Sequence, residues 1–135
     1  TQAESSAASD VYKRQRQLDY GFGGADLIQP ISQVVKNKSK IFFDGGVCRG
    51  TDVVKAISLG ADCVGIGRLQ CYAAATSGRE GLNKMIDILT HEILVCMRLL
   101  GVNNLDDLNS NYIKKDISIS EPSLVSSFPL IEEGY

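Results

Sequence analysis

Two glycine-rich loops, each containing an arginine, hold the residues of this sequence best suited to binding an anion. The first loop is Asp44-Gly45-Gly46-Val47-Cys48-Arg49-Gly50, and the second is Gly65-Ile66-Gly67-Arg68. Glycines let backbone N–H groups approach an anion closely, and an arginine offers a forked cation. Taken singly, each loop is equally well explained as a glycine turn with a solvated arginine. Together, separated by one predicted helix, they predict a phosphate site.

The elements around these loops predict a parallel α/β arrangement. Short apolar runs predict buried strands directly before the two loops, and apolar residues at three- and four-residue spacing predict helices. Alternating helices and strands favour a parallel sheet, either doubly wound or part of a (β/α)8 barrel. No G-x-G-x-x-G follows the first strand, which weakens a dinucleotide-binding interpretation. The predicted strands cover residues 41–43 and 63–66, and the predicted helices cover 25–36, 52–59, 69–75 and 78–101.

The composition argues against several classes of function. The 135 residues have a formal net charge of -2, with acidic and basic residues interspersed, so no nucleic-acid partner is expected. No apolar run is long enough to span a bilayer, so membrane association is not indicated. The four cysteines and His91 lack metal-ligand spacing. We expect the cysteines to pack in a reduced, cytoplasmic protein without a metal site, with Cys63 and Cys96 facing a core.

A longer stretch of the sequence resembles a known enzyme family. The run IFFDGGVCRGTDVVKAISLGADCVGIG over 41–67, followed by Arg68, is similar to FMN-dependent α-hydroxy-acid dehydrogenases and oxidases. That family includes glycolate oxidase, lactate oxidase, mandelate dehydrogenase and flavocytochrome b2. The resemblance begins at RQLDY over 16–20 and ends with LLGV and LDDL, so it covers about 16–110. It implies the C-terminal portion of a (β/α)8 TIM barrel, strands 7 and 8 with their helices, in an incomplete barrel.

The resemblance also implies what the parent enzyme does. It would use FMN to oxidise a small (S)-2-hydroxy acid to a 2-oxo acid, and it would assemble as a homo-oligomer, typically a tetramer. Arg16 matches the arginine that grips the substrate carboxylate, a task suited to a guanidinium fork. The residues that match the flavin-phosphate and ribityl contacts are Asp44, Gly45, Gly46, Val47, Cys48, Arg49, Gly67 and Arg68.

The sequence departs from the family pattern at two places. Cys48 stands where the family has a phosphate-binding arginine, so Arg49 and Arg68 would have to neutralise the phosphate. The family's catalytic histidine lies three residues before the carboxylate-binding arginine, and here that position is Lys13. We therefore expect no catalytic residue in this chain.

The segment 1–15 is interpreted as an adapter-like or disordered non-native stretch, and 111–135 as an extended C-terminal tail. Two alternatives remain for the region between them. One is a non-catalytic half barrel that binds a phosphate-bearing ligand. The other is a fragment of another FMN or phosphate barrel, such as IMP dehydrogenase or type 2 isopentenyl-diphosphate isomerase.

Overall fold

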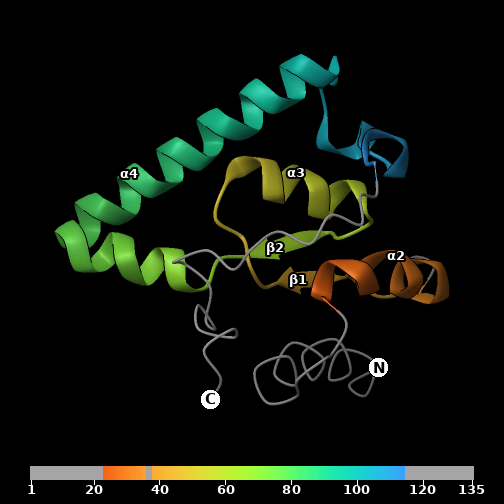
Figure 1. Cartoon of the computed structure of the whole chain (residues 1–135), viewed down its shortest axis with the longest axis horizontal. Helices are drawn as coiled ribbons and strands as arrows, with labels where there is room; N and C mark the ends of the chain where they lie inside the picture. The colour runs from red at the N-terminus through yellow and green to blue at the C-terminus, as the bar shows by residue number, and fades with distance from the viewer. Residues whose placement is uncertain (1–22, 36–37, 115–135) are drawn as a thin grey trace, which may run out of the picture.

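The computed structural model describes residues 23–35 and 38–114 of the chain. Within these residues, α-helices and short 3-10 helices accompany a two-stranded sheet (Figure 1). The segment 1–15 and the tail beyond residue 114 lie outside the described part, so their interpretation stays a prediction. In chain order the elements are α2 (Gly24–Val35), β1 (Phe42–Asp44), α3 (Gly50–Ser58), β2 (Cys63–Gly65), α4 (Arg68–Leu100), η1 (Leu105–Asp107) and η2 (Ser110–Tyr112).

The two strands are parallel neighbours joined by the crossover helix α3. Phe42 pairs with Cys63, and Asp44 pairs with Gly65. Parallel neighbours cannot be joined by a tight hairpin and need a longer crossover, usually a helix. The predicted alternation of strands and helices is therefore confirmed, and the strand bounds differ from the predicted ones by one residue.

Helices cover one face of the sheet, and the other face is bare within the described part of the chain. Phe42 is 69% exposed, and its partner Cys63 is exposed as well. Successive side chains of a strand point to opposite faces, so Phe43 and Val64 face the covered side. Strands of a complete parallel sheet are buried on both faces. The described residues are therefore only part of a layered α/β fold. The cluster on the covered side consists of Ile28, Ile41, Ala56 and Ala61, with Ile31, Phe43, Leu59 and Val64 packed against it.

Helix α4 has two arms that meet at a kink (Figure 1). Ser77 and Gly78 leave the helical backbone conformation, and Gly78 has a φ of +53°. Glycine adopts this left-handed conformation without steric cost, and Gly/Ser pairs are common sites of helix kinks. The sequence predicted two separate helices over 69–75 and 78–101, and in the structure they follow one another directly at this kink.

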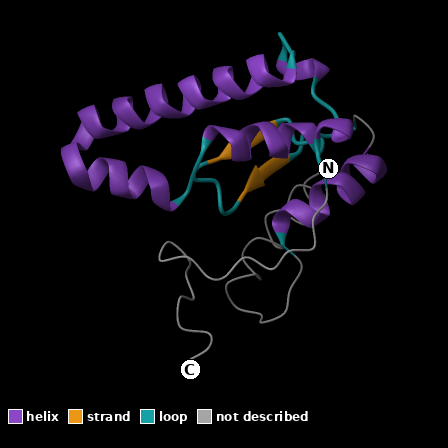
Figure 2. Cartoon of the chain, turned by 45° about the horizontal axis from the view of Figure 1, so that its top comes forward, coloured by secondary structure: helices purple, strands orange, loops and turns teal. Residues whose placement is uncertain are grey.

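Helix α3 lies between the sheet and the longer arm of α4 (Figures 1 and 2). Val54 of α3 and Met97 of α4 are buried in one cluster, which Val102 and Leu108 complete. The sequence predicts an apolar stripe on α4 that faces a core, formed by Leu82, Met85, Ile86, Leu89, Ile93, Cys96, Met97 and Leu100. Leu89 is buried too, so part of this stripe does face a core. Ile86, which belongs to the same predicted stripe, is 54% exposed.

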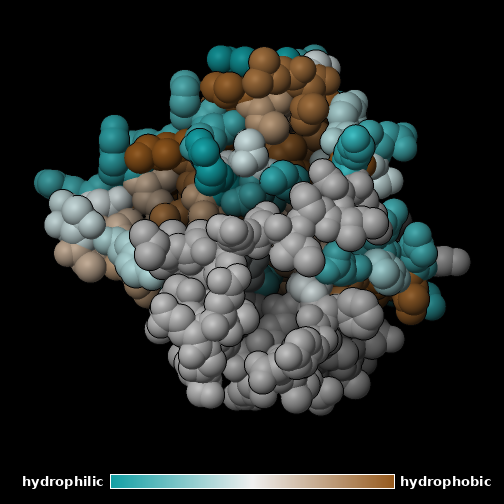
Figure 3. Space-filling view, in the orientation of Figure 1, coloured by the Kyte–Doolittle hydropathy of each residue, from teal (hydrophilic) through white to brown (hydrophobic). Residues whose placement is uncertain are grey.

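Several apolar side chains stay on the surface, many of them along α4 (Figure 3). Leu99 is 84% exposed, and Ile88 and Val95 are exposed as well. The expectation that Cys63 packs in a core is wrong for the described residues, because its side of the sheet is uncovered. None of the helices described here combines the length and apolarity needed to cross a bilayer.

Candidate cofactor site

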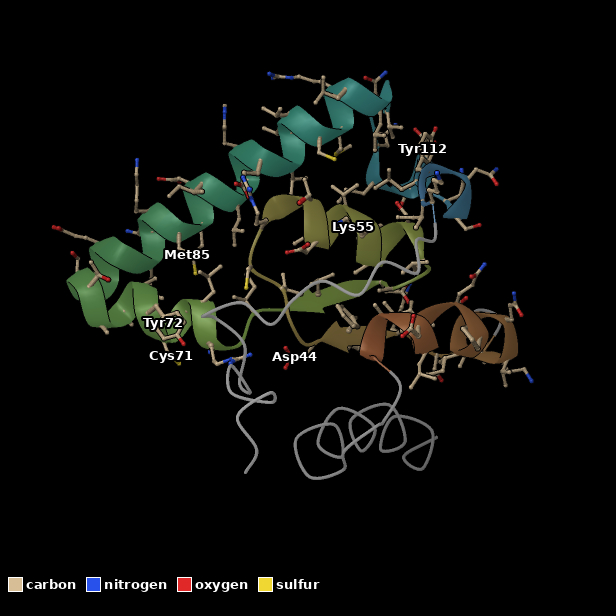
Figure 4. The ribbon with its side chains drawn as sticks, viewed as in Figure 1. Asp44, Lys55, Cys71, Tyr72, Met85 and Tyr112 are labelled. Carbon is tan, nitrogen blue, oxygen red and sulfur yellow. The ribbon has the colours of Figure 1, made fainter. Side chains whose placement is uncertain are left out.

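The two glycine-rich loops begin at the same edge of the sheet. Asp44 ends β1 and Gly65 ends β2, and these two residues are register partners. The loops that follow therefore start side by side, as expected for the carboxyl ends of parallel strands, where ligands of α/β folds commonly bind. The side chain of Asp44 points to the face of the sheet opposite α3 (Figure 4).

Gly65 leaves room for the carboxylate of Asp44. A Cβ atom added at Gly65 would lie 3.2 Å from the Cβ and 3.3 Å from the Cγ of Asp44. Both distances are shorter than ordinary van der Waals contact, so a larger residue at position 65 would displace the Asp44 side chain. The glycine of the second loop thus fixes where the carboxylate of the first loop can lie.

The first loop exposes Gly46 and Cys48 on either side of a buried valine. Gly45 and Gly46 have φ angles of 129° and 70°, values that favour glycine. Val47 is buried and holds the loop to the fold, and Cys48 next to it is exposed. Among the described residues, the Cβ position of Gly46 has no neighbour within 4 Å. The loop therefore offers open backbone at Gly46 and a neutral thiol at Cys48.

Carboxylates of the chain itself occupy the N-terminus of α3. The N–H groups of Cys48 and Arg49 donate to Oδ2 of Asp52, at 3.1 and 3.0 Å. The N–H of Gly50 donates to Oε2 of Glu92, at 2.7 Å. The first N–H groups of a helix are its natural anion-binding donors. The N–H groups of Arg49 and Gly50 at this helix end, and that of Cys48 just before it, therefore already have acceptors within the chain.

Arg49 binds the same glutamate. Its Nε and Nη2 donate to Oε1 of Glu92 at 3.2 and 2.8 Å. The hydrogen bond from Arg49, aided by the Gly50 N–H, holds the pKa of Glu92 below its ordinary value, and Glu92 in turn raises the pKa of Arg49. The predicted phosphate cation is thus engaged with a carboxylate that the sequence interpretation missed. The sequence carried one signal for this contact. Glu92 lies three residues after Leu89 and four before Cys96, two members of the apolar stripe that is predicted to face a core.

The second loop leads directly into α4. Gly67 is the N-cap residue, no side chain caps this end, and Arg68 is the first helical residue. Arg68 is exposed and has an interaction within the fold. Among the described residues, no group of His, Cys, Asp or Glu side chains could hold a metal ion. Arg16, predicted to bind the substrate, lies outside the described residues.

Comparison with known proteins identifies the family. The family model described as FMN-dependent dehydrogenase matches residues 15–115. The chain belongs to this family. Its cofactor is FMN, which confirms the cofactor expected from the sequence.

Curated relatives are oxidases and dehydrogenases. A peroxisomal (S)-2-hydroxyacid oxidase of Arabidopsis thaliana is 41% identical over 101 residues, 75% of this chain and 28% of the relative. An L-lactate dehydrogenase (cytochrome) of Wickerhamomyces anomalus is 45% identical over 125 residues, 89% of this chain and 22% of the relative. The chain therefore spans less than a third of the length of these relatives. The expectation of a cytoplasmic protein is wrong, because two relatives at 41% and 40% identity are peroxisomal oxidases.

Solved structures show the same relationship. A flavocytochrome b2 mutant with pyruvate bound matches with a TM-score of 0.70 at 36% identity, over 87% of this chain and 31% of that one. A Pediococcus acidilactici lactate oxidase matches with a TM-score of 0.67 at 36% identity, over 73% of this chain and 28% of that one. These neighbours are FMN-dependent TIM-barrel enzymes, and the described chain is a partial α/β fragment.

Proposed function

We propose that the chain is the part of an FMN-dependent barrel that includes strands 7 and 8 and binds the flavin phosphate. The enzyme would oxidise (S)-2-hydroxy acids to 2-oxo acids. The observation that carries this proposal is the pairing of Asp44 with Gly65, because it starts both glycine-arginine loops at one sheet edge. Phosphate sites of (β/α)8 barrels lie in the loops after the last two strands.

Asp44, Gly46 and the pair Gly67-Arg68 fit the cofactor best. The Asp44 carboxylate can accept a hydrogen bond from a ribityl hydroxyl, and the open backbone at Gly46 allows a phosphate to come close. Arg68 would supply the phosphate with a charge-assisted donor at the start of α4. The guanidinium of Arg49 already holds Glu92, and Arg68 also has an interaction within the fold. Each arginine would therefore share its charge between the phosphate and its present partner.

Substrate binding would rely on Arg16, whose fork can hold a carboxylate and so orient the substrate's α-carbon. Bound FMN would supply the oxidising chemistry. The family's proton-accepting histidine would stand at the position of Lys13, and a lysine charged at neutral pH is a poor base. This replacement favours the second candidate function, a non-catalytic module that binds FMN or another phosphate-bearing ligand.

The uncovered sheet face supports the assignment to a larger barrel. Phe42 and Cys63 are exposed on that face, where a closed barrel would place the side chains of further strands. The exposed Leu99 of α4 is compatible with the homo-oligomer that we propose for the parent enzyme.

Replacing Arg68 by alanine tests the phosphate site. We expect FMN to bind the full chain about 10- to 100-fold more weakly, because a hydrogen bond to a charged group contributes roughly 1.5–3 kcal/mol. Quenching of flavin fluorescence during titration measures the dissociation constant. Arg98→Ala is the matched control, since it removes the same charge from the last turn of α4. Equal dissociation constants for Arg68→Ala and the unaltered chain would contradict this site.

Replacing Cys48 by arginine should have the opposite effect. Cys48 is exposed in the first loop, so an arginine there can reach an anion without entering the core. We expect FMN to bind about tenfold more tightly, as a charged donor replaces a neutral thiol. Cys71→Arg adds the same charge at another exposed cysteine and should change FMN binding less. If both variants tighten binding equally, the gain is due to net charge alone.

A further inference from the structure

The Glu92 carboxylate ties the first loop to α4 through two consecutive residues. Oε1 accepts both guanidinium hydrogen bonds of Arg49, and Oε2 accepts the N–H of Gly50. The side chain of Glu92 is only 23% exposed, whereas that of Arg49 is 71% exposed. The Glu92 side chain is therefore the more buried partner of this contact, and the end of the first loop packs against it.

Helices α3 and α4 pack closely at this contact. A Cβ atom added at Gly50 would lie 2.6 Å from both the Cβ of Glu92 and the backbone N of Ile93. The start of α3 therefore lies directly against α4. Helix α4 begins at Arg68 and turns at the Ser77-Gly78 kink before it reaches Glu92. Its first arm therefore carries the second loop, and its second arm holds the end of the first loop.

We propose that Glu92 is a positioning residue for the flavin phosphate, holding the loop of residues 45–49 in register with Gly67-Arg68. This inference rests on the proposed FMN function of the two loops. On this account Arg49 acts on the cofactor through Glu92 and does not itself bind the phosphate. The open backbone at Gly46 then faces the phosphate because the end of its loop is fixed.

The competing account makes Arg49 a phosphate ligand, and the two accounts predict opposite signs. If Arg49 binds phosphate, Glu92 competes with the cofactor for its guanidinium, and removing the glutamate charge should tighten FMN binding. If Glu92 positions the loop, removing its charge should weaken FMN binding. The substitution Glu92→Gln separates the accounts, because glutamine keeps the shape of the side chain without its charge.

We expect Glu92→Gln to weaken FMN binding by the full chain about tenfold. Riboflavin lacks the phosphate, so its binding should change by less than about twofold in the same fluorescence titration. Asp62→Asn is the matched control. Like Glu92, Asp62 accepts hydrogen bonds from a basic side chain and from the N–H of the following residue. The donors are Nζ of Lys40 at 2.7 Å and the N–H of Ile41 at 2.8 Å. Those residues precede β1, at the opposite end of the strand from the loop, so this variant should keep FMN affinity.

Three results would overturn the inference: tighter FMN binding in Glu92→Gln, unchanged FMN binding, or an equal loss for FMN and riboflavin. The last would mark Glu92 as merely structural. If the unaltered chain binds FMN no better than riboflavin, the proposed phosphate site fails instead. The positioning role is then tested without cofactor, by comparing the NMR resonances of the Gly46 and Cys48 backbone amides between the variants and the unaltered chain. Glu92→Gln should shift these resonances and Asp62→Asn should not, and unshifted resonances in Glu92→Gln would reject the role.

Discussion

The 135-residue chain supplied with FMN is expected to oxidise lactate or glycolate at least about 10²-fold more slowly than an intact family enzyme, because we expect it to lack the family's general base. General-base assistance contributes roughly 10²–10⁴ in rate. The resemblance places the family's histidine at the position of Lys13, and the only histidine of the chain is His91. His91 is exposed on α4, and the resemblance gives it no catalytic role. We therefore expect that it does not act as a substitute base.

Reduction of an electron-accepting dye in the presence of each hydroxy acid measures this rate. Free FMN gives the baseline, and an L-lactate oxidase assayed under the same conditions gives the reference for an intact enzyme. Saturation of the chain with FMN must be verified first by fluorescence quenching, so that a lack of cofactor is not mistaken for a lack of catalysis. Turnover near the reference rate would show that the chain supplies a base other than the expected histidine.

The sequence predicted the local order of elements well because each element has a strong local signal. The apolar runs before Asp44 and Gly65 mark the strands, and glycine follows each of them. The kink of α4 was less accessible, since Ser77 and Gly78 resemble a loop between two helices. In the structure, helical turns directly precede and follow these two residues, so no loop separates the two arms.

The candidate site was harder to predict because its key contact is not local. Arg49 and Glu92 lie 43 residues apart, and they meet only when α3 packs against α4. From the sequence alone, an arginine after a glycine loop is equally suited to a phosphate or to a carboxylate of the protein. The prediction that Cys63 faces a core was wrong for a related reason. A strand residue is buried only where a second layer covers its face, and none of the described residues covers this one.

Replacing Gly50 by alanine should destabilise the chain by about 3 kcal/mol, the upper end of the usual cost of overpacking a core. The added Cβ would lie 2.6 Å from the Ile93 nitrogen and 2.7 Å from the Leu89 carbonyl oxygen, and these backbone atoms cannot rotate away. Helices α3 and α4 would have to separate and open the cluster around Val54 and Met97. Alanine ordinarily gains up to about 1 kcal/mol over glycine within a helix, so crowding should outweigh propensity.

Urea unfolding followed by circular dichroism gives the free energy of unfolding for this test. Gly101→Ala is the control, because Gly101 has a φ of +71° and none of the residues that the structure describes lies within 4 Å of its Cβ position. That variant should lose only about 1–2 kcal/mol, the cost of a left-handed alanine. The two variants separate crowding from backbone strain. Gly50→Ala adds crowding at a helical residue, and Gly101→Ala adds strain at a residue with positive φ. If Gly50→Ala were as stable as the unaltered chain, α3 would not lie against α4 at this distance, and Glu92 could not hold the loop as proposed.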